Sequence, residues 1–168
     1  DLRDPKTMLG PIISQRQRDR IRHHIENAVA NGATLETGGK WEGNRCLPTI
    51  LTNVNPSMVC YQEETFGPVT AIYKVGSADA ALAIANDTAY GLSAAVFTQN
   101  LAEAMRLSQQ IHAGMVHINA PTLHDEPHVP FGGVGDSVMG REGAQTDINH
   151  CTEWKWITIQ APGASHGN

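Results

Sequence analysis

Apolar residues recur at helical spacing near the start of the chain. Ile21 and Ile25 lie one helical turn apart, and Gly32 supplies a residue type that commonly ends a helix. Ser14 is followed three residues later by Gln17, which is the spacing of a capping box at a helix start. The pattern predicts an amphipathic helix between Ser14 and Gly32. Its arginines are interpreted as a solvated helix face.

The middle of the chain alternates runs of β-forming residues with helical segments. The predicted strands are residues 34–37, 49–54, 69–75, 92–98 and 115–119. Ser77 and Asn100 are N-cap residues before the two helices that separate the last three strands. This β-α-β-α-β order predicts an α/β fold, with a parallel sheet and flanking helices.

A long loop, residues 120–135, follows the last of these strands. It contains Pro121, Pro127 and Pro130 and is longer than most connections in compact domains. Ligands of parallel sheets bind beyond the carboxyl ends of the strands. We therefore expect Asn119 and the 120–135 loop to lie at a binding site.

The end of the chain has a different pattern. In residues 151–160, Trp154 and Trp156 alternate with other large residues, so apolar bulk falls on both faces of a strand with period two. An unpaired strand of this kind tends to pair with another chain. We expect this segment to be an oligomerisation strand, and the small, polar residues 161–168 to be a disordered tail.

Composition narrows the functional classes. The 168 residues are 40% hydrophobic and 17% charged, which is typical of a globular protein. The formal net charge of −5 gives no electrostatic reason to expect a nucleic-acid partner. No apolar run approaches the roughly 20 residues that cross a membrane, so no membrane partner is expected. Three scattered cysteines argue against a disulfide framework and favour a reducing compartment, the cytoplasm.

Two adjacent carboxylates, Glu63 and Glu64, precede a predicted buried strand. Burying both in ionised form is costly, so we expect one to face water while the other accepts hydrogen bonds from a ligand. A charged turn before a strand is the alternative interpretation. With the continuation Thr65-Phe66-Gly67-Pro68, the segment resembles the Glu-Glu-x-Phe-Gly-Pro motif of the aldehyde dehydrogenase superfamily.

Other segments that resemble this family follow in the family's order, from about Asp4 to Gln160. Each is short and weak alone, whereas the ordered set is specific. They are Gly10-Pro11-Ile12-Ile13, Gly38-Gly39, Pro48-Thr49-Ile50-Leu51, Asn86-Asp87-Thr88-Ala89-Tyr90-Gly91-Leu92, Val96-Phe97-Thr98, Gly114-Met115-Val116-His117-Ile118-Asn119 and Pro130-Phe131-Gly132-Gly133. The resemblance implies the catalytic domain of the aldehyde dehydrogenase fold, with residues 1–150 as its C-terminal portion.

The resemblance also implies roles for three side chains. Glu64 resembles the carboxylate that holds the nicotinamide-side ribose of NAD or NADP, and Phe66 resembles the aromatic residue beside the nicotinamide ring. Phe131 resembles an aromatic residue that lines the aldehyde entrance. Family members oxidise an aldehyde to a carboxylic acid after attack by a Cys thiolate. The nucleophile and the general base belong to family segments that precede this chain, so we expect no catalytic residue here and an inactive fragment of a homo-oligomeric enzyme, a dimer or tetramer.

Two details bear on this resemblance. Cys46, Cys60 and Cys151 stand in contexts unlike that of the family's nucleophile, and we expect ordinary packing or surface roles for them. Val138 stands where the family usually has glycine. If that position has positive φ, valine costs on the order of 1–2 kcal/mol, which puts the conformation of this turn in question.

The His-Asp-Glu-Pro-His sequence at 124–128 combines residue types that bind metals. His124 and His128 could converge on zinc, but no third ligand is evident, so we expect no metal. The segment looks most similar to family members that act on benzaldehyde, vanillin and salicylaldehyde, which favours a substrate-entrance loop. Two alternatives to the enzyme stay open: a non-catalytic protein that associates through the fold's oligomerisation surface, and a metal-binding module built on the two histidines.

Overall fold

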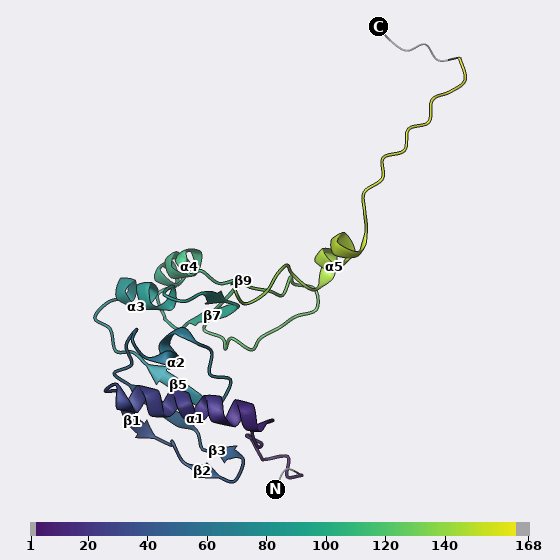
Figure 1. Ribbon diagram of the computed structural model, residues 1–168. Helices are drawn as coiled ribbons and strands as arrows, with labels where there is room; N and C mark the ends of the chain where they lie inside the picture. The colour runs from purple at the N-terminus through teal and green to yellow at the C-terminus, as the bar shows by residue number, and fades with distance from the viewer. Residues whose placement is uncertain (1–2, 164–168) are drawn as a thin grey trace. The chain divides into compact units, whose positions relative to one another are not determined.

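The computed structural model describes residues 3–163, whose contacts divide the chain into two compact units (Figure 1). Unit 1 extends to Ala81 and unit 2 begins at Leu82. Both units combine strands with helices, which confirms the predicted α/β class. Among the described residues, no helix has both the length and the apolar character that a membrane crossing requires.

Unit 1 combines a three-stranded sheet, a two-stranded hairpin and two helices. Its strands are β1 (Thr34–Thr37), β2 (Trp41–Glu42), β3 (Arg45–Cys46), β4 (Thr49–Thr52) and β5 (Val69–Ile72). Its helices are α1 (Gln15–Ala30) and α2 (Val59–Gln62). β4 is the central strand, antiparallel to β1 and parallel to β5, and β2 pairs with β3. The short α2 packs against α1.

The start of α1 follows its sequence pattern only in part. Ser14 Oγ accepts a hydrogen bond from the backbone N–H of Gln17 at 3.2 Å, which confirms the N-cap. The Gln17 side chain, however, donates to the loop before β5, so it makes a tertiary contact rather than the reciprocal half of a capping box. The helix ends at Ala30, and Gly32 follows with a φ of 100°, a left-handed conformation that favours glycine.

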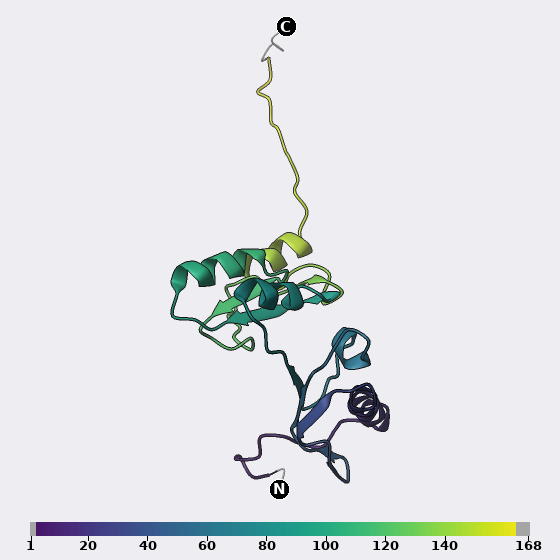
Figure 2. The ribbon, with the colours of Figure 1, turned by 90° about the vertical axis from the view of Figure 1, so that its left-hand side faces the viewer.

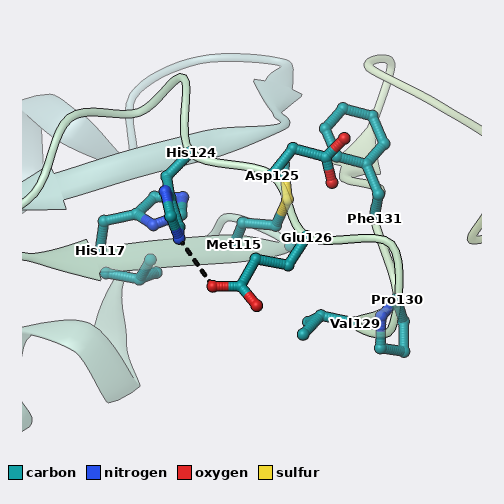
Figure 3. A pocket seen from close by; sticks show the side chains of 10 residues that line it. Met115, His117, His124, Asp125, Glu126, Val129, Pro130 and Phe131 are labelled. Carbon is teal, nitrogen blue, oxygen red and sulfur yellow. Dashed lines mark hydrogen bonds and ion pairs between the residues drawn. The ribbon is translucent and has the colours of Figure 1, made fainter. Parts of the chain in front are cut away.

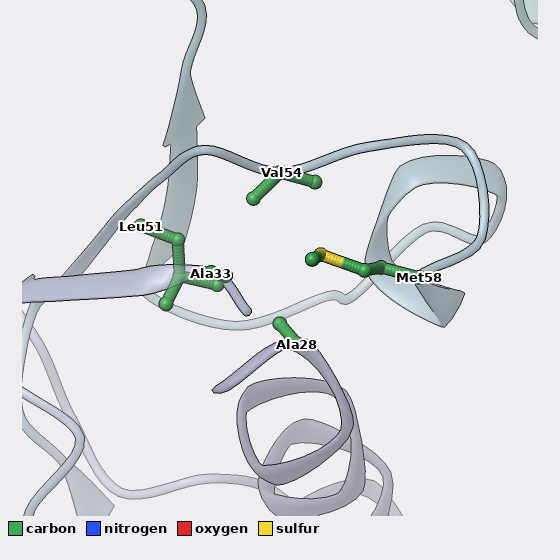
Figure 4. Packing of buried hydrophobic residues seen from close by; sticks show 5 residues of the cluster. All are labelled: Ala28, Ala33, Leu51, Val54 and Met58. Atoms are coloured by element: carbon green, nitrogen blue, oxygen red, sulfur yellow. The ribbon is translucent and has the colours of Figure 1, made fainter. Parts of the chain in front are cut away.

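The core of unit 1 forms where α1, β4 and the start of α2 meet (Figure 4). Leu51 and Ala28 are fully buried, and Ala33, Val54 and Met58 complete the cluster around them. Burial of a leucine side chain contributes roughly 1.5–3 kcal/mol to folding. This cluster fixes α1 against the sheet, and α1 carries the side chains that hold part of the candidate site.

Unit 2 contains two pairs of strands and their helices. Its strands are β6 (Tyr90–Gly91), β7 (Ser93–Val96), β8 (Met115–Ile118) and β9 (Val134–Gly135). The helices are α3 (Ala78–Ala85), which spans the boundary between the units, α4 (Leu101–Gln110) and α5 (Ala144–Cys151). β7 and β8 pair in parallel, and α4 connects them and packs on both (Figure 2). β6 pairs antiparallel with β9.

The five longer strands and the helices after Ser77 and Asn100 lie where the sequence predicts them, although most strands are shorter than predicted. The β-α-β-α-β order predicts that the last three of these strands are parallel neighbours in one sheet. In the structure β5 pairs in parallel with β4, and β7 pairs in parallel with β8. The pattern of a strand shows which faces are buried. It does not show which segment pairs with its edge, since pairing depends on contacts distant in sequence.

Close backbone contacts bring three of the sequence motifs together in unit 2. A Cβ atom on Gly114 would lie 2.0 Å from the carbonyl oxygen of Gly132, so only glycine fits at this position just before β8. A Cβ atom on Gly133 would lie 2.8 Å from the carbonyl oxygen of Gly91. These glycines therefore allow the segment after Phe131 to pack directly on β8 and β6.

The turn around Val138 carries no left-handed strain at the valine. Among the described residues, the non-glycine residues with positive φ are Asn53, Phe66 and Asn119. In this part of the chain the positive φ values fall on glycines, including Gly135 at 59°. Valine at position 138 therefore carries no cost of a left-handed conformation, because the positive φ values of this turn fall on neighbouring glycines.

The segment after α5 differs from its predicted form. No strand is assigned to residues 152–160 in the described part of the chain, and α5 extends through Cys151. Trp154 and Trp156 are 98% and 90% exposed. A strand here would need a neighbour from another chain, so its role in oligomerisation stays a prediction. Of the predicted tail at 161–168, residues 164–168 lie outside the described residues.

Candidate functional site

Residues 63–67 form a loop between α2 and β5, and hydrogen bonds hold this 63–67 loop to α1. The side-chain amide of Gln17 donates to the backbone oxygens of Thr65 at 2.7 Å and of Phe66 at 3.0 Å. Carbonyl groups outside regular secondary structure need partners when they lose water, and Gln17 provides them. The position of the loop backbone therefore depends on α1.

The two adjacent carboxylates of this loop have different surroundings. Glu63 Oε2 lies 3.3 Å from Arg20 Nη2 and 3.6 Å from His24 Nε2, both on α1. Glu64 is exposed, and within residues 3–163 no hydrogen bond or ion pair engages its side chain. Glu64 rather than Glu63 is therefore available to a ligand.

His24 lies at the buried centre of this attachment. Its ring is 1% exposed, and Nδ1 lies 3.0 Å from the hydroxyl of Thr65. Burial lowers the pKa of His24, and the charge of Arg20 lowers it further, while Glu63 opposes the shift. A neutral imidazole has one donor and one acceptor nitrogen. Since the carboxylate of Glu63 only accepts, we assign the proton to Nε2, which leaves Nδ1 to accept from the Thr65 hydroxyl.

Phe66 has an uncommon conformation for a bulky residue. Its φ is 49° and its side chain is 72% exposed. Left-handed backbone costs a non-glycine residue about 1–2 kcal/mol, so neighbouring contacts must offset this cost. The next residue, Gly67, packs directly on α1, since a Cβ atom there would lie 2.5 Å from Ile21 Cδ1. An aromatic ring held in water by such contacts is typical of a ligand-binding surface.

Unit 2 contains a cavity of about 320 Å³ between β8 and the 120–135 loop (Figure 3). Met115, Val129 and Phe131 line it with apolar surface. Phe131 is half-buried, and its backbone exchanges two hydrogen bonds of 2.8 Å with Glu142. The structure thus brings Phe131 together with residues 124–126, which belong to the segment that the sequence marks as a substrate entrance.

Polar side chains also line this cavity, among them His124 and Glu126 from the loop and His117 from β8. Glu126 lies between two histidines, with Oε1 at 3.1 Å from His124 Nε2 and Oε2 at 3.4 Å from His128 Nδ1. The rings of His117 and His124 meet edge to face at 6.2 Å. Across residues 3–163, no three histidine, cysteine or carboxylate side chains gather as a metal site would require. The loop histidines are instead paired with a carboxylate.

Asn119, which the sequence places at a binding site, hydrogen-bonds to the backbone of Thr98. Its Oδ1 accepts from the backbone N–H of Thr98 at 2.9 Å, and its Nδ2 donates to the Thr98 oxygen at 3.0 Å. These bonds join the ends of β7 and β8. Of the two features that the sequence places at a binding site, the 120–135 loop lines the cavity, whereas Asn119 fixes the strands.

The three cysteines do not have the surroundings of an activated nucleophile. Cys46 is buried and Cys60 is half-buried, and burial raises the pKa of both thiols. A nucleophilic cysteine reacts as the thiolate, which burial in apolar surroundings disfavours. Cys151 is exposed at the end of α5. These environments agree with the packing and surface roles expected from the sequence.

Comparison with known proteins gives these features a family. The sequence profile described as "Aldehyde dehydrogenase family" matches residues 1–157. The chain belongs to the aldehyde dehydrogenase family. A vanillin dehydrogenase from Pseudomonas fluorescens is 42% identical over 160 residues, which are 95% of this chain and 33% of that protein. The resemblance drawn from the ordered motifs is thereby confirmed.

Solved structures of aldehyde dehydrogenases share the fold of this chain. A salicylaldehyde dehydrogenase from Pseudomonas putida G7, complexed with salicylaldehyde, matches with a TM-score of 0.87 and 36% identity, over 94% of this chain and 33% of its own. A Mycobacterium tuberculosis aldehyde dehydrogenase complexed with NAD+ matches with a TM-score of 0.86 and 36% identity, over 96% of this chain and 34% of its own. This chain therefore spans about a third of the length of these aldehyde dehydrogenases.

The aldehyde dehydrogenase motifs identify the 63–67 loop but not the side chains that hold it. Gln17, Arg20 and His24 come from α1, and their spacing of three and four residues places them on one face of the helix. That spacing is the signal that sequence reasoning missed. The interpretation of the α1 arginines as a solvated face holds only in part, because Arg20 also pairs with Glu63.

His24 should make the stability of the fold depend on pH. Its pKa in the folded protein is lowered from an ordinary value of about 6.5, chiefly because burial disfavours the charged ring. Between these two values the unfolded chain binds more protons than the folded one. The free energy of unfolding should therefore rise as the pH rises through this window, and fall on acidification. His24→Asn should flatten this part of the curve, measured by urea unfolding at several pH values.

The exposed His112 provides the matched control for this experiment. His112→Asn also removes one histidine, but it leaves the contact between α1 and the 63–67 loop intact, so the wild-type slope should persist. Equal slopes for wild type and His24→Asn would contradict the expected contribution of His24.

Proposed function

We propose that the protein containing this chain is an NAD(P)-dependent aldehyde dehydrogenase, which oxidises an aldehyde to a carboxylic acid. The observation that supports this function is the exposed pair of Glu64 and Phe66, on a loop held to α1 in a chain of the aldehyde dehydrogenase family. Few, unpaired cysteines also support a reducing compartment, the cytoplasm, as its location.

NAD(P)+ fits what the 63–67 loop offers. An ionised carboxylate accepts hydrogen bonds from two ribose hydroxyls, and Glu64 is exposed for this purpose. Phe66 presents a flat apolar ring two residues away, against which a nicotinamide ring can pack. The cofactor, when bound, accepts a hydride from the substrate. The part of Glu64 and Phe66 is to hold and orient it.

We propose that the aldehyde binds at the cavity in unit 2 and that this aldehyde is aromatic. The cavity volume of about 320 Å³ lies within the range of roughly 300–1,000 Å³ that is typical of small-molecule sites. Phe131 and Met115 offer apolar surface to a ring, and the paired His124 and Glu126 offer polar groups. Relatives named for vanillin and salicylaldehyde support this substrate class.

The 168-residue chain by itself should not oxidise aldehydes. Burial raises the pKa of Cys46 and Cys60, and a covalent mechanism has no path without an activated nucleophile. Purified chain should therefore produce no NADH from benzaldehyde and NAD+. NADH formation that is lost in Cys46→Ala, Cys60→Ala or Cys151→Ala would overturn this expectation. The alternative of a non-catalytic association protein predicts instead that the full-length protein is also inactive.

Glu64→Gln in the full-length protein should weaken cofactor binding about tenfold, or roughly 1.4 kcal/mol. The amide keeps the shape of the side chain but loses the charge and one acceptor. Hydride transfer should also slow, because a loosely held ribose lets the nicotinamide leave its reactive position. Cofactor titration and the single-turnover rate of NADH formation measure both effects.

Glu63→Gln is the matched control, because this carboxylate already contacts Arg20 and His24. Its effect on cofactor binding should be much smaller than that of Glu64→Gln. A larger effect of Glu63→Gln would reverse the assignment of the two residues. Unchanged binding and rate in both variants would remove the 63–67 loop from the cofactor site.

We also propose that residues 151–160 pair with another copy of the protein in a homo-oligomer, a dimer or tetramer. Exposed tryptophans of this kind mark association surfaces. Trp154→Lys combined with Trp156→Lys should shift the full-length protein to smaller species, measured by size-exclusion chromatography with light scattering. Met8→Lys combined with Ile13→Lys changes two other exposed apolar residues and should leave the mass unchanged. An unchanged mass of the tryptophan variant would refute the proposal.

A further inference from the structure

We infer that His24 is a positioning residue that directs Glu64 toward the cofactor, by holding the residues on both sides of it. The inference rests on the proposed role of Glu64 as the ribose ligand. Glu63, Glu64 and Thr65 are consecutive, and His24 approaches the first and the third of them. Glu63 and Glu64 are both exposed, but within residues 3–163 only the Glu64 side chain of these three has no hydrogen bond or ion pair.

The extended backbone of this segment determines where the Glu64 side chain points. Glu63 has extended backbone, with φ of −108° and ψ of 142°. Successive side chains of an extended segment point to opposite sides. His24 Nδ1 lies 3.0 Å from Thr65 Oγ1, and Glu63 Oε2 lies 3.3 Å from Arg20 Nη2 and 3.6 Å from His24 Nε2, so both neighbours are held toward α1. Glu64 is thereby directed away from α1.

Burial restricts the ring of His24 to one orientation, so the ring can hold the loop in a fixed position. On α1 it stands among the buried residues Ile21 and Ile25, and a packed ring loses the freedom that an exposed side chain keeps. Arg20 also contacts Glu63, but both of those side chains are exposed, and surface ion pairs of this kind contribute little. The loop side chain that His24 itself fixes is therefore Thr65, through the 3.0 Å contact with the Thr65 hydroxyl.

The hydroxyl of Thr65 allows the contact to be removed without disturbing the core. Thr65→Val in the full-length protein keeps the shape but loses the donor to His24, whereas Thr65→Ser keeps the donor. Thr65→Val should raise the cofactor Kd about fivefold, the equivalent of one neutral hydrogen bond, with an unchanged KM for the aldehyde. Thr65→Ser should bind the cofactor like wild type. Thr70→Val, at an exposed threonine of β5, is the matched control and should also bind like wild type.

A double-mutant cycle distinguishes positioning from a purely structural role. If His24 and Thr65 act through Glu64, Thr65→Val should have no further effect on the cofactor Kd in a Glu64→Gln background. In a His24→Phe background, which lacks both ring nitrogens, Thr65→Val should likewise add nothing. A purely structural role predicts instead that Thr65→Val causes the same loss in the Glu64→Gln background as in wild type, together with a lower Tm.

The outcomes separate this inference from the proposed function. A full-length wild type that neither binds NAD(P)+ nor oxidises an aldehyde would refute the proposed function itself. An active wild type with the same cofactor Kd as Thr65→Val would overturn only the role of His24. Additive losses in the cycle would overturn it as well.

Discussion

Four side chains of α1 contact the 63–67 loop, and one of them, Arg20, pairs with Glu63 at the surface. The amide of Gln17 satisfies two backbone oxygens, the ring of His24 meets a hydroxyl and a carboxylate, and Ile21 packs where Gly67 has no side chain. The loop has no strand or helix of its own at these positions. Without α1 its backbone would have no fixed place, and neither would Glu64 and Phe66.

The free energies of these contacts are comparable with the cost of the left-handed backbone at Phe66. A left-handed φ at Phe66 costs about 1–2 kcal/mol, and a neutral hydrogen bond contributes roughly 0.5–1.5 kcal/mol. The two bonds from Gln17 are therefore sufficient to offset that cost, one of them directly on the Phe66 carbonyl. The position of α1 depends in turn on the buried cluster around Leu51, so the hydrophobic core of unit 1 supports the geometry of the loop.

In unit 2, glycines rather than polar side chains hold the candidate site in position. Gly114 and Gly133 allow backbone segments to approach more closely than any Cβ atom permits, and the segment that carries Phe131 packs there. Asn119 uses its amide to join the ends of β7 and β8. The position of the cavity beside β8 is thus set by backbone packing, and the 120–135 loop supplies most of the side chains that line it.

The sequence by itself determined the α/β class, the strands and capped helices, and the family. Local signals carry these features: hydrophobic spacing, N-cap residues, and motifs such as 63–68 and 130–133 that belong to one segment each. It also singled out Glu64, Phe66 and Phe131, because the motifs contain them. The capping box at Ser14 was only half correct, since Gln17 had a stronger use elsewhere.

Only the tertiary structure decided which partners these segments take. It paired β5 with β4, assigned Asn119 to Thr98, and brought His24 to the 63–67 loop from 41 residues away. It also distinguished the two carboxylates, since Glu63 lies close to Arg20 and His24, whereas within residues 3–163 no hydrogen bond or ion pair engages the Glu64 side chain. The physical reason is that spacing along a helix or strand fixes which side chains share a face. What that face meets depends on packing between segments that are distant in the chain.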